Sequence, residues 1–237
     1  MSCMPVVNRS ILAEACATIV ATYANECTQY EWNGATLKCA ENERMKLARI
    51  ILRAPTGTAR EASLLDIGWI TLINHMRMQL LRFRRRVYTM NDQLAALMRN
   101  INAEELLPWE KRCRRTMELL DLEEFQEAAR LDTIEKKKWV AKIAEATRKL
   151  NLKESVLRME NETKKTTRLY RHLLEGLDST WRPTFITVNQ HNGCAIGAIH
   201  RLRAGFNYCN ANAKLRHLTH NEACDTCGTL NRKSMYS

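Results

Sequence analysis

Two cysteines near the end of the sequence have the spacing of metal ligands. Cys224 and Cys227 are separated by two residues, and thiolates at this spacing can bind one tetrahedral zinc ion. Gly228 permits the tight turn that follows the second thiolate. A structural zinc site needs four ligands, and no histidine or cysteine follows Cys227. The motif therefore supplies half of a zinc site.

Three interpretations of this half-site stay open. In the first, the chain is a truncated copy that has lost the second half of the site. In the second, upstream residues complete it, and the candidates are Cys209, His217 and His220. In the third, the two thiols bind no metal, since half a site gives little preorganisation. Zinc is the one candidate cofactor, with Cys224, Cys227, His217 and His220 as its candidate ligands.

Side chains for enzymatic chemistry are sparse. Cys194 and His200 could act as a nucleophile and its base, but only their closeness in sequence suggests the pairing. The sequence contains neither a phosphate-binding P-loop nor the H-E-x-x-H pattern of zinc hydrolases. We therefore expect no catalytic site.

Basic residues, in contrast, follow a clear pattern within residues 44–87. Two successive segments are amphipathic at helical spacing, and each has an apolar face and a cationic face. The apolar positions are Leu47, Ala48, Ile51 and Leu52 in the first segment, and Trp69, Ile73, Met76, Leu80, Phe83 and Val87 in the second. The cationic positions are Lys46, Arg49 and Arg53, then Arg77, Arg82, Arg84, Arg85 and Arg86, with Arg60 between the two groups.

Two interruptions separate these segments. Pro55 disfavours helical geometry at the residue before it, so the first helix should end near Arg53. The chain should resume helical structure from Thr58, and a second turn is expected at Gly68. These breaks would place the two cationic faces on separate helices.

The same stretch resembles a known family. It is similar to the helical thumb segment that follows the polymerase core in reverse transcriptases of non-LTR (LINE-type) retrotransposons. The matching residues are Arg49, Ile51, Leu52, Ala54, Pro55, Gly57, Thr58, Arg60, Glu61 and Ala62, then Ile67, Gly68, Trp69 and Leu72. Residues 199–206 also resemble the R-L-R-T-G-H pattern near the C-terminus of such enzymes, although Ala204 and Phe206 depart from it.

The resemblance implies a partner and a missing part. In the family the thumb packs against the primer–template duplex of RNA and DNA, so the nine basic residues named above are expected to contact phosphates. The Cys224–Cys227 motif matches the opening of the family's zinc knuckle, in which a histidine and another cysteine follow. Such polymerases carry adjacent aspartates that hold metal ions, and this sequence has no such pair. The implied polymerase core would lie upstream, and the chain is expected to be a non-enzymatic fragment.

Composition agrees with an anionic partner. The 237 residues carry a formal net charge of +11 and a pI of about 9.4, which suits nucleic acid first and an anionic membrane surface second. The alternative is a helical interaction protein whose basic faces bind acidic protein surfaces or anionic membranes. The nine cysteines and the absence of a secretory signal or a long apolar run favour a nuclear or cytoplasmic protein that does not span a membrane.

The remaining sequence predicts an all-α fold, an irregular assembly of amphipathic basic helices with a small irregular C-terminal tail. Only eight glycines and four prolines occur. We expect helices over residues 6–29, 91–102 and much of 108–174, and a strand-like run at 184–188. A last helix should span 194–203, with Ala195, Ile199 and Leu202 facing inward. The lysines at 136–138 should lie on a solvated face, and a groove for a duplex is the alternative.

These elements suggest three regions. Residues 1–102 form the thumb-like helical region, residues 103–176 a charged helical region, and residues 177–237 the tail with the partial zinc motif.

Overall fold

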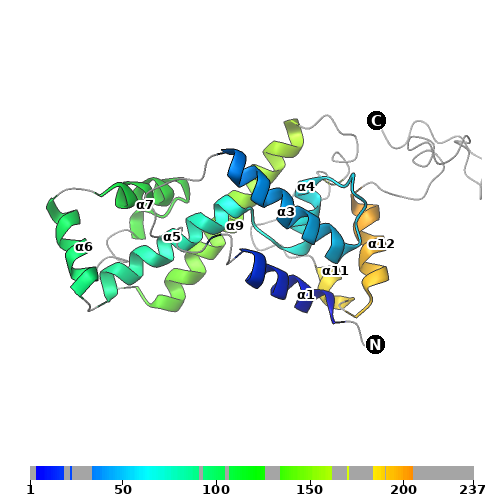
Figure 1. Ribbon diagram of the computed structural model, residues 1–237, viewed down its shortest axis with the longest axis horizontal. Helices are drawn as coiled ribbons and strands as arrows, with labels where there is room; N and C mark the ends of the chain where they lie inside the picture. Colours follow the sequence, from blue (N-terminus) through cyan, green and yellow to red (C-terminus); the bar gives the residue numbers. More distant parts are fainter. Residues whose placement is uncertain are drawn as a thin grey trace, which may run out of the picture.

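The described part of the chain is helical throughout. The computed structural model describes residues 4–18, 22, 34–90, 93–104, 107–125, 134–161, 170, 184–189 and 191–204, and no strand occurs among them. The helices cross one another in an irregular assembly with no layered sheet (Figure 1). The predicted all-α fold is therefore confirmed.

The described helices are separated by turns and by segments that lie outside the described residues. In chain order they are α1 (Val6–Ala13), the π-helix η1 (Glu14–Thr18), α3 (Gly34–Leu52), α4 (Arg60–Ile67), α5 (Leu72–Thr89), α6 (Gln93–Glu104), α7 (Pro108–Leu119), the 3-10 helix η2 (Glu123–Phe125), α9 (Lys136–Asn161), α11 (Thr184–Val188) and α12 (Gly193–Arg203). None of the described helices is long and apolar enough to cross a membrane.

Both predicted breaks around α4 are present. Helix α3 ends at Leu52, two residues before Ala54, whose geometry Pro55 restricts. Gly68 ends α4 in the left-handed conformation, with a φ of 80° that glycine adopts without strain. Residues 61–67 of the short helix between these breaks are all buried. Helix α4 is therefore a core element held between two sharp turns.

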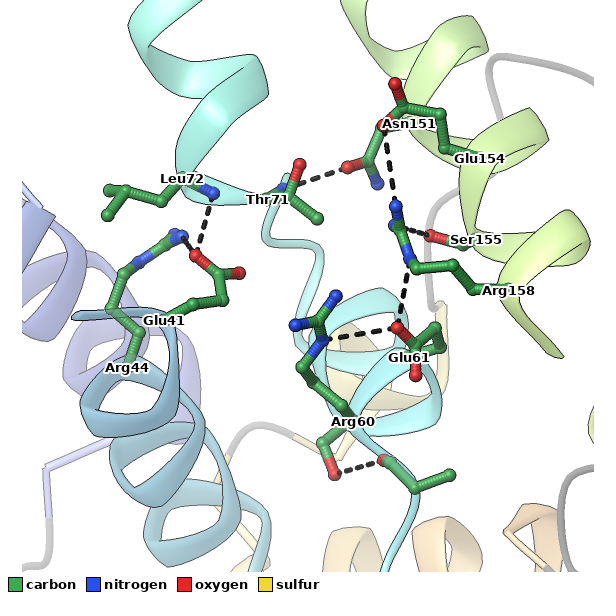
Figure 2. Close-up of polar contacts among 12 residues, drawn as sticks. Glu41, Arg44, Arg60, Glu61, Thr71, Leu72, Asn151, Glu154, Ser155 and Arg158 are labelled. Atoms are coloured by element: carbon green, nitrogen blue, oxygen red, sulfur yellow. Dashed lines mark hydrogen bonds and ion pairs between the residues drawn. The ribbon is translucent and has the colours of Figure 1, made fainter. Parts of the chain in front are cut away.

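Helix α5 occupies the middle of the structure and packs against α6, α7 and α9 (Figure 1). Its buried apolar residues include Met76, Leu80 and Val87, as the predicted stripe requires, but the stripe's first member, Trp69, lies before the helix begins. Thr71 at its N-terminal boundary forms no side-chain cap. Instead, the Thr71 N–H donates to Asn151 Oδ1 (2.8 Å) and the Leu72 N–H to Glu41 Oε2 (2.9 Å), as Figure 2 shows.

Three hydrophobic clusters hold the helices together. The first joins α5, α7 and α9 around Met117, Trp139 and Ile143. The second joins α1, α3, α4, α11 and α12, and the third centres on α4 with Met159 and Tyr170. The first cluster includes residues on both sides of position 102, and the second combines the start of the chain with residues 186 and 196. Apolar residues from all three expected regions therefore contribute to shared clusters.

The prediction of a strand at residues 184–188 is wrong, because these residues form helix α11. A strand needs a neighbour to satisfy its backbone, and no other strand occurs among the described residues. A turn of helix satisfies part of the backbone locally. It also buries Ile186 in the second cluster, against α1 and α12.

The inward face of α12 was also predicted wrongly. Ile196, Gly197 and His200 are buried, whereas Leu202 is 57% exposed. The reason is a close approach to α3. A Cβ at position 197 would lie 3.1 Å from both the Leu52 carbonyl oxygen and Arg53 Cβ, so the helix turns its glycine toward α3.

Several other predicted helices are present in the structure. Helix α6 and the start of α7 at Pro108 agree with the predictions, and α9 is one continuous helix with Trp139, Ile143 and Met159 buried. The described part of the first predicted helix comprises α1 and η1. In α1, Val6 and Ser10 face the core, whereas Ile11 is 61% exposed.

A buried ion pair connects α5 to α7. Arg84 and Glu110 are each 1% exposed, and the guanidinium binds the carboxylate through Nε (3.1 and 3.0 Å) and Nη2 (2.8 Å). Burial alone would lower the pKa of Arg84, but the hydrogen bonds and charge of Glu110 more than offset burial, so the pKa is raised. Glu110 also pairs with the more exposed Arg114 (3.6 Å), whereas the only carboxylate that pairs with Arg84 among the described residues is Glu110.

We predict that Glu110→Ala destabilises the fold by about 3–5 kcal/mol, because it leaves a buried guanidinium without its counter-ion. Urea denaturation followed by circular dichroism measures the free energy of unfolding. The control is Glu118→Ala, an exposed position on the same helix, where a change within about 0.5 kcal/mol is expected. The double variant Arg84→Met, Glu110→Leu should be more stable than Glu110→Ala; equal stabilities would contradict the argument.

Candidate nucleic-acid interface

The nine basic residues expected to bind phosphates divide into two groups. Most contact acidic side chains or carbonyl oxygens of the protein itself, and a few do not. The structure thus separates basic residues that bind acceptors within the protein from those that do not, a difference that the sequence pattern does not reveal.

Arg84 is not placed to meet a phosphate. Its guanidinium is buried and bound to Glu110, and its Cζ lies 5.1 Å from the centre of the Tyr88 ring. A phosphate could reach it only by displacing both α7 and the carboxylate. The sequence pattern predicted Arg84 as part of the cationic face, whereas the structure places its side chain within the core.

Arg60 and Arg77 belong to a polar network that ties α4 and α5 to α9. Glu61 accepts from Arg60 Nε (3.2 Å) and from Arg158 Nε (3.1 Å), as Figure 2 shows. Arg77 donates from Nη1 to Glu154 Oε1 (3.1 Å) and to Asn74 Oδ1 (2.7 Å). These ion pairs satisfy the two arginines within the fold.

Arg49 and Arg85 hold turns in place. Arg49 Nη2 donates to the Thr58 carbonyl (2.5 Å), which closes the turn between α3 and α4, and partial burial lowers the pKa of Arg49. Arg85 Nη2 donates to the Ile134 carbonyl (3.0 Å) just before α9. Lys46 is exposed and pairs with exposed Glu43 at 2.6 Å, a contact of the kind that contributes little to stability.

Arg53, Arg82 and Arg86 form no ion pair with any described residue. Arg82 and Arg86 lie one turn apart on α5, and two like charges at this spacing repel each other. Arg82 is half-buried, its Nε has no acceptor in the described part of the chain, and burial lowers the pKa of Arg82. Arg86 is exposed. These two side chains are the cationic pair of α5 that the fold leaves uncompensated.

His75 lies on the same face of α5, about two turns before Arg82. It is 8% exposed, its Nε2 lies 3.1 Å from Gln79 Nε2, and its Nδ1 has no hydrogen-bond partner among the described residues. Burial, together with the charges of Arg44 and Arg82, lowers the pKa of His75 from 6.5 to about 4. His75 is therefore neutral at pH 7 and adds no charge to the cationic pair.

A buried cluster around Asp66 was missed by the sequence analysis. Asp66 Oδ2 lies 2.7 Å from His200 Nδ1, and Oδ1 accepts from Tyr170 Oη (2.7 Å) and Arg203 Nε (3.0 Å). Burial, and then the Asp66 charge, raise the pKa of Tyr170 well above its usual range, so the phenol remains a donor. These partners are more than 100 residues from Asp66 in sequence, and no local pattern signals such a pairing.

This cluster also bears on the suggested Cys194–His200 pair. His200 is fully buried with its Nδ1 against Asp66, whereas Cys194 is exposed and accepts from Arg53 Nη1 at 2.9 Å. The two side chains therefore have different partners and different environments. Nothing in this arrangement forms a nucleophile with its base.

The candidate zinc ligands Cys209, His217, His220, Cys224 and Cys227 lie outside the described residues. Within the described ranges no group of three or more histidine, cysteine, aspartate or glutamate side chains could hold a metal ion. Comparison of the chain with protein-family models, with curated proteins and with solved structures finds no match.

The His75 environment predicts a pH dependence of stability. Because the folded-state pKa (about 4) is below the ordinary 6.5, the unfolded chain binds the proton more tightly. Stability should therefore fall as the pH drops from about 6.5 to about 4, by on the order of 3 kcal/mol from this group. Urea denaturation at pH 7 and pH 4.5 measures the loss. His75→Gln removes the titrating group, and an equal loss in the variant would contradict the prediction.

Proposed function

We propose that this chain binds nucleic-acid duplexes through their phosphate backbone. The observation that carries the proposal is the cationic pair of α5, formed by Arg82 and Arg86, which has no carboxylate partner in the described structure. Other arginines of the same helix are neutralised or hydrogen-bonded within the fold. A net charge of +11 supplies the long-range attraction.

The pair favours backbone contacts over base recognition. Two guanidinium groups one helical turn apart can each bind a phosphate oxygen through parallel N–H donors. A phosphate would also relieve the repulsion between Arg82 and Arg86. Contacts of this kind position a duplex but carry no sequence information. The affinity for duplexes should therefore vary little with nucleotide sequence and should fall as the salt concentration rises.

The biological role follows from the resemblance described above. We propose that the chain corresponds to the thumb and C-terminal region of a non-LTR retrotransposon reverse transcriptase and binds the primer–template duplex. In this proposal the polymerase core that carries the catalytic aspartates is a separate, upstream part. The chain itself acts in the nucleus or cytoplasm as a binding element without enzymatic activity.

We predict that Arg82→Ala with Arg86→Ala weakens duplex binding by a similar factor for unrelated sequences. Each phosphate contact contributes about −0.9 to the log–log slope of affinity against salt, so the loss of two contacts should make the slope shallower by about 2. Fluorescence anisotropy with labelled duplexes over a salt series gives both quantities. These substitutions break no ion pair of the described structure.

The matched control is Lys137→Ala with Lys138→Ala, which removes the same charge from an exposed face of α9. Its effect should be smaller, because these lysines belong to a solvated face. Equal effects of the two double variants would assign the binding to net charge alone and contradict the interface. Stronger binding to anionic vesicles than to duplex at one salt concentration would favour the interaction-protein alternative.

The proposal also predicts the absence of polymerase chemistry. Asp66 is buried and bound by three donors, and Asp121 is an isolated exposed residue of a turn, so neither forms a carboxylate pair. Purified chain with a primer–template, magnesium and nucleotides should extend no primer on a sequencing gel. Extension that copurifies with the protein through successive columns would refute the fragment interpretation.

A further inference from the structure

A second group of cations gathers where α1, the end of α3 and the start of α12 meet. A Cβ added at Gly193 would lie 3.4 Å from Arg9 Nη2 and 3.5 Å from Arg53 Nε. Because both nitrogens lie this close to one point, they are no more than about 7 Å apart. Arg9 comes from α1, and Arg53 directly follows α3. The fold thus brings two guanidinium groups together from positions 44 residues apart in sequence.

No described carboxylate neutralises this group. Neither Arg9 nor Arg53 forms an ion pair within the described residues, and Arg9 Nε is buried without an acceptor. The neighbouring polar side chain is the exposed thiol of Cys194, which accepts from Arg53 Nη1 at 2.9 Å. A third arginine, Arg201, donates to the Arg53 carbonyl at 3.4 Å. Neighbouring guanidinium groups repel each other, which raises the free energy of the folded state when no carboxylate lies between them. A bound anion would remove this repulsion.

The backbone at this point adds to the positive potential. The two arginines surround the first residue of α12, an eleven-residue helix, and the first N–H groups of a helix have no acceptor within it. The Asn192 side chain satisfies only the Ala195 N–H (3.0 Å).

We infer that Arg9, Arg53 and the start of α12 form a phosphate-binding site. The inference deepens the proposed function and rests on it, since the phosphate would belong to the bound duplex. Helix α12 and the end of α5 lie toward opposite ends of the molecule's long axis (Figure 1). The site is therefore a contact separate from the cationic pair of α5. Arg53 belongs to the basic pattern of the sequence, whereas Arg9 and α12 join it only in the folded chain.

The Cys194 thiol provides a local probe of this site. A phosphate bound to Arg53 covers Sγ and competes for the guanidinium that contacts it. Alkylation by iodoacetamide, an uncharged reagent, is followed by mass spectrometry of the peptide that contains Cys194. Cys39 is the internal reference, because it is exposed and lies at the other end of α3. Saturating duplex should slow alkylation of Cys194 and leave Cys39 unchanged.

Two variants test the assignment. Arg53→Gln and Arg9→Gln should each remove the protection of Cys194 and weaken duplex binding, while Lys38→Gln, an exposed charge on α3, should preserve both. Circular dichroism confirms that each variant is folded. If duplex binds with steep salt dependence but leaves Cys194 unprotected, the site is refuted and the proposed function stands.

A second ligand separates the two proposals further. Inorganic pyrophosphate, compared with chloride at equal ionic strength, should slow alkylation of Cys194 in the wild-type chain and not in Arg53→Gln. If no duplex binds, the proposed function is refuted. Protection of Cys194 by pyrophosphate alone would then support an anion-binding site that does not serve duplex binding. Absence of protection by both ligands overturns the site.

Discussion

The start of α5 is held by side chains from two distant helices, and the arrangement of the other helices depends on this junction. Every helix begins with N–H groups that lack acceptors, and Thr71 supplies none from its own side chain. Glu41 and Asn151, 31 and 80 residues away from their partners, accept from the Leu72 and Thr71 N–H groups. Arg44 completes the junction by donating to both Glu41 and the Ile70 carbonyl. Helix α5 therefore begins where it does only when α3 and α9 are packed against it, and the positions of its arginines follow from that packing.

The use of arginine is the second theme of this structure. A net charge of +11 suggests a surface covered with free cations. Many arginines within residues 44–87, however, bind carboxylates or carbonyl oxygens of the protein itself. Arg44, Arg60, Arg77 and Arg84 pair with carboxylates, and Arg49 and Arg85 bind carbonyl oxygens. The planar guanidinium suits such buried, multidentate contacts better than an ammonium group. The candidate interface is correspondingly small, and its members are recognised by the absence of an internal partner.

Local features were predictable from the sequence, and long-range partners were not. Pro55, Gly68 and Pro108 act on neighbouring residues, so the ends of α3 and α4 and the start of α7 could be predicted. The run at 184–188 has strand-forming residues but no partner strand, and the tertiary environment outweighs its propensity. The inward face of α12 depends on the approach of Gly197 to α3. Likewise, the different roles of Arg82 and Arg84 depend on whether a carboxylate from another helix reaches them, as Glu110 reaches Arg84 26 positions away.

The cluster around Asp66 has a consequence for synthesis of the chain. Asp66 is fully buried on α4, and its donors come from residues 170, 200 and 203. Until those residues have left the ribosome, burial of α4 would enclose a carboxylate without a donor, which is unfavourable by several kcal/mol. The core around α4 should therefore close only after Arg203 has left the ribosome. Contacts between such distant positions slow folding and leave apolar surface exposed in the meantime, so the nascent chain should be a client for chaperones.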